Sequence, residues 1–62
     1  MERNAGRIRR RLLREGWFLA RQGRNHEVYH HPDVPQSIQL PRHRELSSYV
    51  ARSIAKAAGW DD

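Results

Sequence analysis

A twelve-residue stretch from Arg21 to Pro32, RQGRNHEVYHHP, gathers the side chains of this sequence that could do chemistry. His26 follows the segment Gly23-Arg24-Asn25, whose residue types favour a turn, so His26 is expected to begin a strand. An imidazole can accept a proton near neutral pH, and arginines beside it can neutralise a phosphate. RNA brings its own nucleophile, the 2′-OH, so its cleavage requires little more than a base and a phosphate clamp.

In such a reaction His26 would be the general base, while Arg21, Arg24 and Asn25 would hold the scissile phosphate. A site of this kind would cut RNA and spare DNA, which lacks the hydroxyl. Composition alone slightly favours a simpler interpretation, in which His26 is a surface histidine after a turn. Polar surface or RNA-contacting positions are expected for the remaining histidines, His30, His31 and His43.

The spacing of the histidines argues against a metal site. His26 and His30 are four residues apart, which on a strand separates them by roughly 13 Å, too far for one ion. His30 and His31 would point to opposite faces of that strand. The flanking Tyr29 and Pro32 are unsuited to a helix, on which the same spacing could bring two ligands together. Catalysis by a serine nucleophile is not expected either, because the serines lack the glycine context of a nucleophile elbow. No metal and no cofactor are therefore expected.

The charge balance favours a polyanionic partner. Twelve Lys+Arg oppose seven Asp+Glu, giving a formal charge of +5, and all but one of these cations are arginine, which binds phosphate bidentately. There is no cysteine, so no disulfide supplements the core, and residues 1–62 are expected to form one domain with a marginal core. No apolar run approaches a membrane span or a signal-peptide core, which makes a cytoplasmic protein the default expectation.

The elements that must position this chemistry begin with a helix predicted over residues 4–15. Asn4 is suited to cap its start, and Gly16 to end it in the left-handed conformation. Trp17 would then pack back on the helix. The 3/4 spacing predicts a buried stripe of Ala5, Ile8, Leu12 and Leu13.

Three strands are predicted next. The first covers residues 17–22, and its first four residues, Trp17-Phe18-Leu19-Ala20, are apolar at both parities, which suits a strand partly buried on both faces. Residues 23–25 tolerate positive φ and predict a hairpin to a second strand at 26–31. Residues 33–36 read as a loop, and 37–40 as a short third strand with Ile38 and Leu40 facing inward.

The two faces of the second strand differ. One carries His26, Val28 and His30, and the other carries Glu27, Tyr29 and His31. Because Tyr29 is the larger core candidate, His26 is placed on the outward face, although Val28 argues the other way.

A second helix is predicted from Ser47 or Ser48 to Ala58, after a basic connector at 41–44 from which Arg42 and His43 are expected to contact RNA. Its expected stripe is Leu46, Val50, Ile54 and Ala57. Gly59 would end it, with Trp60 repeating the packing of the first helix end. The order helix, three strands, helix predicts an α+β fold, with a three-stranded antiparallel sheet and both helices on one face, as in double-stranded-RNA-binding domains.

The order and spacing of certain residues resemble those of the HicA toxins of HicA–HicB toxin–antitoxin pairs, nearly end to end. The matching residues are Gly16-Trp17, Arg21-Gln22, Asn25-His26, Tyr29, His31-Pro32, the segment 41–45, Arg52-Ser53-Ile54 and Ala58-Gly59. The resemblance implies a metal-independent ribonuclease that cuts mRNA and arrests translation and growth, and a HicB antitoxin that covers the active site. It puts the catalytic histidine at His26. The commonest family form has Gly-Ser directly before that histidine, where this sequence has Arg24-Asn25 and a glycine at Gly23.

Two other classes of function fit the same residues. A non-catalytic RNA- or DNA-binding module could use the basic face without cutting. A protein-interaction module could use it to hold an acidic antitoxin. Basic charge favours RNA and an acidic partner equally, so charge alone does not separate them.

Overall fold

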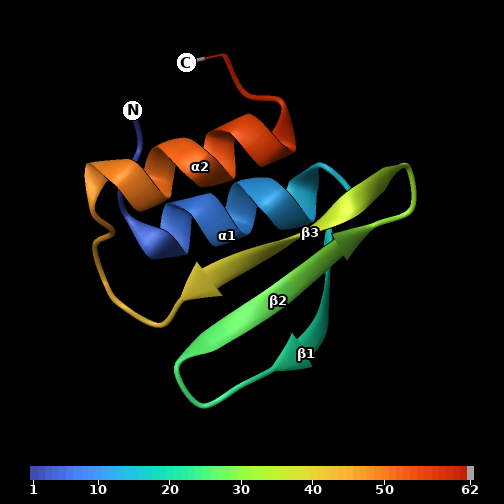
Figure 1. The fold of residues 1–62 in the computed structure, drawn as a ribbon, viewed down its shortest axis with the longest axis horizontal. Helices are drawn as coiled ribbons and strands as arrows, with labels where there is room; N and C mark the ends of the chain where they lie inside the picture. Colours follow the sequence, from blue (N-terminus) through green and yellow to red (C-terminus); the bar gives the residue numbers. More distant parts are fainter. Residues whose placement is uncertain (62) are drawn as a thin grey trace.

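The computed structural model describes residues 1–61 and has the predicted order of elements (Figure 1). These are helix α1 (Ala5–Arg14), strands β1 (Phe18–Gln22), β2 (His26–His31) and β3 (Val34–Pro41), and helix α2 (Ser48–Ala58). Consecutive strands are neighbours in an antiparallel sheet of order β1-β2-β3. In the part of the chain described, neither helix is long and apolar enough to cross a membrane.

Helix α1 begins and ends as its sequence predicts. The Asn4 side chain accepts a hydrogen bond from the Arg7 N–H at 2.9 Å, which satisfies one of the free amides of the first turn. Gly16 has φ 99°, and the Trp17 N–H donates to the Leu12 carbonyl at 3.0 Å. This is the Schellman arrangement, in which a residue without a Cβ reverses the chain and the next residue packs on the last turn.

Helix α2 is capped in the same way. Ser47 accepts from the Val50 N–H at 3.2 Å, Gly59 has φ 80°, and the Trp60 N–H donates to the Ala55 carbonyl at 2.8 Å. The prediction that both helices end with the same Gly-Trp capping arrangement is confirmed.

The predicted burial of the first strand is wrong. Trp17 is buried, but it precedes β1, and every residue of β1 is exposed. The strand lies at the edge of the sheet, and a bulge between Leu19 and Arg21 shifts its register on β2. The apolar run therefore has two separate causes. Trp17 packs at the end of α1, and the apolar residues that follow belong to an exposed edge strand.

Strand β3 is longer than predicted. It begins at Val34 and includes the segment 34–36 that was assigned to a loop, so the turn after β2 is only Pro32-Asp33. The predicted inward residues Ile38 and Leu40 are buried. Proline at position 35 is tolerated because β3 is also an edge strand.

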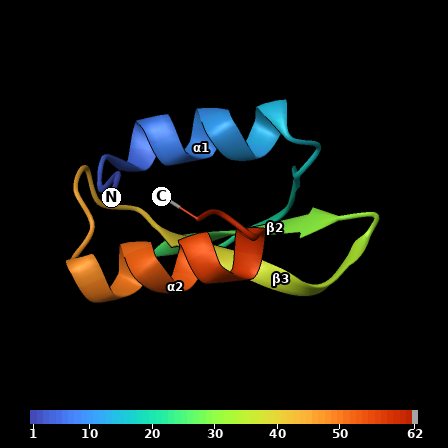
Figure 2. The same cartoon turned by 90° about the horizontal axis from the view of Figure 1, so that it is seen from above.

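The core lies between the sheet face of Tyr29 and the two helices. Figure 1 shows both helices on the same side of β3, and Figure 2, turned by 90°, shows α1 as a layer apart from the strands and α2 at the depth of β3. The cluster comprises Ala5, Ile8, Leu12, Trp17, Tyr29, Ile38, Leu40, Leu46, Ala51 and Ile54. Leu13 was placed in this stripe wrongly, since it is 51% exposed. On α2 the buried stripe is Ala51, Ile54 and Ala55, with Val50 and Ala57 at its margins.

Substituting Gly16 by Ala should destabilise the protein more than the same change at Gly59. Both have positive φ, which costs a residue with a Cβ about 1–2 kcal/mol. At Gly16 the new Cβ would also lie 2.9 Å from His31 Nε2, whereas nothing lies within 4 Å of one at Gly59. Urea unfolding of the two variants measures the difference. Equal losses of stability would show that His31 does not restrict this position.

Candidate active site and nucleic-acid interface

His26 starts β2 and lies on the sheet face opposite the core, as predicted from the parity of Tyr29. It pairs with Pro41 of β3, and its carbonyl accepts the Gly23 N–H at 2.8 Å. The imidazole lies against Gly23, because a Cβ added there would be 3.6 Å from Cε1 and 3.7 Å from Nε2. His26 is half-buried.

The turn before His26 does not have the positive-φ conformation that its residue types suggested. Positive φ occurs only at Gly16 and Gly59 among the described residues, so Gly23 does not supply a left-handed turn. Glycine matters at position 23 for space, since a Cβ would lie 3.2 Å from the His26 carbonyl oxygen and close to the ring. A Cβ would be in ordinary van der Waals contact with the ring, so the His26 carbonyl is the group that restricts this position.

The structure brings several predicted phosphate ligands to this corner of the sheet. Arg21 is opposite Val28 in the β1–β2 ladder, which puts it on the same face as His26 and diagonal to it. Arg24 is exposed in the turn. The Asn25 carbonyl accepts the Arg42 N–H at 3.0 Å, so the connector after β3 is joined to the turn before β2.

Arg42 and His43 also line a basic hollow beside the start of α1. Its volume is about 370 Å³. The lining residues are Asn4, Ala5, Gly6, Arg9, Arg42, His43 and Arg44. No candidate role followed from the sequence for Arg9 or Arg44. Arg44 belonged to a segment already recognised as basic, but nothing in the spacing of Arg9 pointed to the connector.

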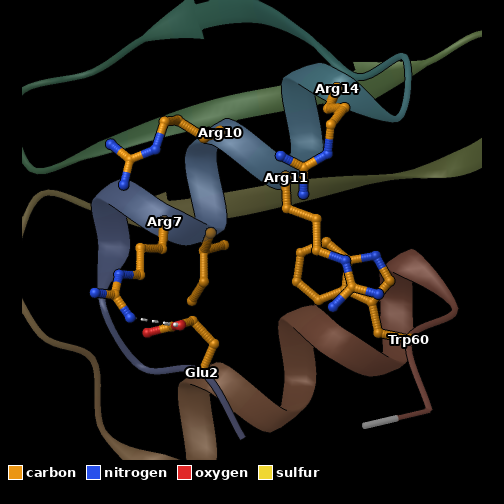
Figure 3. Close-up of a pocket in the computed structure, with 7 residues that line it drawn as sticks. Glu2, Arg7, Arg10, Arg11, Arg14 and Trp60 are labelled. Carbon is orange, nitrogen blue, oxygen red and sulfur yellow. Dashed lines mark ion pairs between the residues drawn. The ribbon is translucent and has the colours of Figure 1, made fainter.

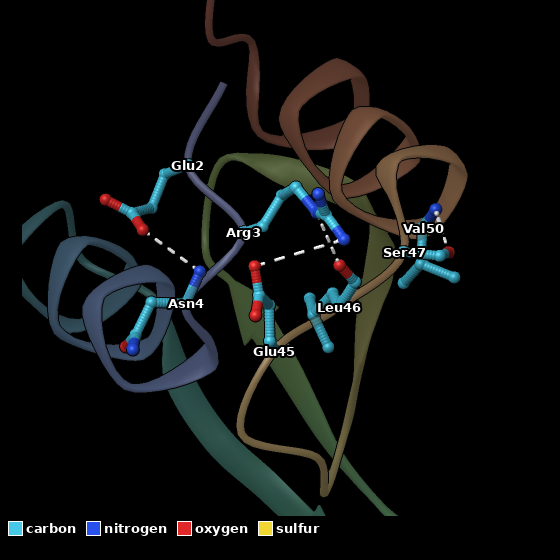
Figure 4. A network of polar contacts seen from close by, with 7 residues as sticks. All are labelled: Glu2, Arg3, Asn4, Glu45, Leu46, Ser47 and Val50. Atoms are coloured by element: carbon cyan, nitrogen blue, oxygen red, sulfur yellow. Dashed lines mark hydrogen bonds and ion pairs between the residues drawn. The ribbon is translucent and has the colours of Figure 1, made fainter.

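The connector is held in place by the residues before α1 (Figure 4). Arg3 and Leu46 exchange hydrogen bonds, with the Leu46 N–H donating to the Arg3 carbonyl and Arg3 Nε donating to the Leu46 carbonyl, each at 2.8 Å. The Ala5 N–H donates to the Arg44 carbonyl at 2.9 Å. Arg3 also approaches Glu45 at 3.9 Å. These contacts position Arg42 and His43 relative to His26.

Glu27 fixes the strand that carries His26 to helix α1. It is the buried charged residue of the core face, and its Oε1 accepts from Arg9 Nε at 3.0 Å and from the Tyr29 hydroxyl at 2.9 Å. Burial opposes ionisation of this carboxyl, but the hydrogen bonds from Arg9 and Tyr29 outweigh it and hold the pKa of Glu27 below its ordinary value of 4.5. The same pairing raises the pKa of Arg9. A buried charge with two donors stabilises one orientation of β2.

His31 has a structural role that was not predicted. Its Nδ1 accepts the Asp33 N–H at 3.0 Å, which leaves Nε2 to donate to the Glu15 carbonyl at 2.9 Å. Its ring also meets Trp17 edge-on, with centroids 5.2 Å apart. Both ring nitrogens of His31 therefore have hydrogen-bond partners within the protein.

His30 is exposed on the face of His26 and lies beside Phe18, with ring centroids 6.2 Å apart. Within residues 1–61, no three side chains of His, Cys, Asp or Glu converge in a way that could hold a metal ion.

A second basic surface lies along α1, where Trp60 docks (Figure 3). Arg11 stacks over the Trp60 ring at 4.2 Å, and the indole Nε1 donates to Glu15 at 2.7 Å. Arg7 forms an ion pair with Glu2 at 3.7 Å. The predicted role of Trp60 in helix-end packing is confirmed.

Comparison with protein families identifies a relationship. The model of the HicA toxin of bacterial toxin–antitoxin systems matches residues 6–60, which include all five elements except the first residue of α1. The match therefore spans His26 and the predicted phosphate ligands on β1, in the turn before β2 and in the connector after β3. No curated protein shows detectable sequence similarity to the chain.

Replacing Glu27 by Gln should remove a pH-dependent part of the stability. The folded pKa of Glu27 is lowered, so its contribution is present above the unfolded pKa and is lost as pH falls through the folded value. We expect Glu27→Gln to be less stable than the parent by about 1–3 kcal/mol near pH 6, with the difference shrinking towards about pH 3. Thermal melting across this range measures it. Glu45→Gln, at an exposed ion pair, serves as control, and a difference that persists at acid pH would contradict this role.

Proposed function

The chain belongs to the HicA toxin family, and we propose that it acts as a metal-independent endoribonuclease that cleaves mRNA with His26 as general base. The observation that carries this proposal is the position of His26. It starts a strand on the face free of helices, its ring fits against Gly23, and Arg21 lies on the same face. These are the groups that cleavage through the 2′-OH requires.

In the proposed reaction the unprotonated nitrogen of His26 accepts the proton of a 2′-OH. The 2′ oxygen attacks the adjacent phosphorus, and the bond to the 5′ oxygen of the next nucleotide breaks as that oxygen takes a proton from water. Negative charge develops on the phosphate in the transition state, where Arg21, Arg24 and Asn25 stabilise it. The chemistry needs no metal because the RNA supplies the nucleophile and the arginines supply the positive charge.

The basic hollow extends this site along the RNA. A backbone hydrogen bond holds Arg42 next to Asn25. RNA nucleotides that flank the scissile phosphate would therefore contact Arg42 and His43 in the hollow. These contacts are to phosphate and contribute affinity that falls with salt and is independent of sequence. Because the proposed substrate is mRNA, we propose that the protein acts in the cytoplasm.

Membership of a toxin family implies an antitoxin partner. We propose that a HicB-type antitoxin covers the open sheet face and excludes RNA from His26. The formal charge of +5 suits an acidic surface on this partner, and the half-buried ring of His26 gives it a site to occlude. Inhibition then requires no change in the fold of the toxin.

Substituting His26 by Ala should abolish cleavage and keep RNA binding. A general base contributes about 10²–10⁴-fold to the rate, so cleavage of total mRNA in the presence of a chelator should fall by at least this lower factor. Tyr49→Ala, an exposed ring on α2, is the control and should cleave as the parent does. Circular dichroism verifies the fold. If the parent protein binds RNA without cutting it, the chain is a non-catalytic RNA-binding module.

Substituting Arg21 or Arg24 by Ala should weaken RNA binding and make it less dependent on salt. Loss of one phosphate contact lowers the slope of log affinity against log salt by about one. Arg52→Ala, an exposed arginine on α2 outside the candidate site, is the matched control. Fluorescence anisotropy with labelled RNA measures both quantities. Equal effects at all three positions would mean that only net charge matters.

A further inference from the structure

The sheet face of His26 carries an exposed aromatic pair that the proposed reaction does not use. Phe18 of β1 is 50% exposed, although it is one of the large apolar side chains of the molecule. It is paired across the ladder with His30 of β2, and the two rings are 6.2 Å apart at an interplanar angle of 55°. Two exposed rings therefore lie beside each other on adjacent strands.

This pair lies in line with the candidate active site. His26, Val28 and His30 share one face of β2, because Tyr29, of the other parity, is in the core. Four residues of strand separate His26 from His30, which is about 13 Å. Arg21 is opposite Val28, midway between the two ends. One face thus bears a base, a guanidinium and an aromatic pair in order along β2.

Single-stranded RNA carries groups that could bind these side chains in the same order. Its unpaired bases stack on aromatic side chains, while its phosphates bind arginine. An RNA strand with stacked bases advances roughly 3.4 Å per nucleotide, so about four nucleotides span the roughly 13 Å between His26 and His30. An extended RNA strand spans this distance with fewer nucleotides. Bases in a duplex are stacked on one another and offer no free face to these rings.

We propose that Phe18 and His30 form a stacking platform for a base of single-stranded RNA a few nucleotides from the bond cleaved at His26, with Arg21 holding a phosphate between them. The inference rests on the proposed function, and it adds that the substrate is single-stranded. Cleavage within duplex regions would require strand opening first.

The surroundings of Phe18 favour a nucleobase over an apolar anchor from a protein. Between the aromatic pair and His26, the open face displays the cation Arg21 and the amide Gln39, while Val28 is only 7% exposed. The nearest carboxylate on β2, Glu27, points to the opposite face. A docking site for an apolar protein segment is instead a contiguous apolar patch. A lone aromatic pair beside a cation suits a base next to its phosphate.

The test separates base stacking from general attraction to a polyanion. Fluorescence anisotropy measures binding of labelled 2′-O-methyl oligoadenylate and oligouridylate, which lack the nucleophile and cannot be cut. A chain of equal length with abasic sugars at every position has the phosphates without the bases. The proteins compared are the parent, Phe18→Ala, Phe18→Trp, His30→Ala and Leu19→Ala. Leu19 is the neighbouring exposed apolar residue of opposite parity and serves as the matched control.

We expect Phe18→Ala to bind the base-bearing oligonucleotides about tenfold more weakly, with an unchanged salt slope and unchanged binding of the abasic chain. Phe18→Trp should restore affinity, and Leu19→Ala should bind as the parent. His30→Ala should show the pattern of Phe18→Ala, which keeps the test available if Phe18→Ala does not fold by circular dichroism.

Parental affinity of Phe18→Ala for the base-bearing chains would overturn the inference, as would an equal loss with the abasic chain. Loss of antitoxin binding alone would likewise overturn it and make Phe18 a protein contact. Because the readout is binding of an uncleavable chain, it is independent of catalysis by His26. A parent protein that cuts RNA while Phe18 has no effect would leave the proposed function intact.

Discussion

The reversal of the chain after α1 is the constraint on which the sheet depends. Gly16 turns the chain in a conformation closed to most residues, and the space where a Cβ would lie is taken by the His31 ring. That ring donates to the Glu15 carbonyl at the helix end and accepts from the backbone beyond β2. One histidine therefore joins the end of α1 to the end of β2, with Trp17 packed between them. The start of β1 has little freedom to move relative to β2, and this fixes which residues of the two strands face each other.

The opposite end of β2 is positioned by different means. Glu27 is bound on the core side by Arg9 of α1, while on the loop side the backbone of Asn25 is bound by Arg42. The residues before α1 hold the same connector near Leu46. His26 thus sits where α1, the β1–β2 turn and the connector after β3 meet. A short chain with a small core can fix the start of a strand in this way, because α1 and the connector, both distant in sequence, add hydrogen bonds to those of the adjacent turn.

Local patterns in the sequence were sufficient for the elements and for the face of His26. Asn4, Gly16, Ser47 and Gly59 act through their own backbone and neighbours, so their roles follow from residue type and position. Other features depend on tertiary contacts. Pro35 suggested a loop because sequence alone does not reveal that β3 is an edge strand. The bond from Arg42 to Asn25 joins backbone groups, which any residues could supply, so no pattern of side chains announces it. The spacing of His31 likewise gave no sign of its bond to Glu15.

The irregular pairing of β1 has a consequence for the behaviour of the free protein. An exposed edge strand with regularly spaced backbone groups can add strands from other copies of the same chain and start aggregation. In β1 the extra residue between Leu19 and Arg21 breaks that regular spacing and increases the local twist. A second copy brought to this edge would find amides and carbonyls out of step with its own. The bulge that sets the side chain of Arg21 towards the face of His26 thereby also protects the edge against self-association at high concentration.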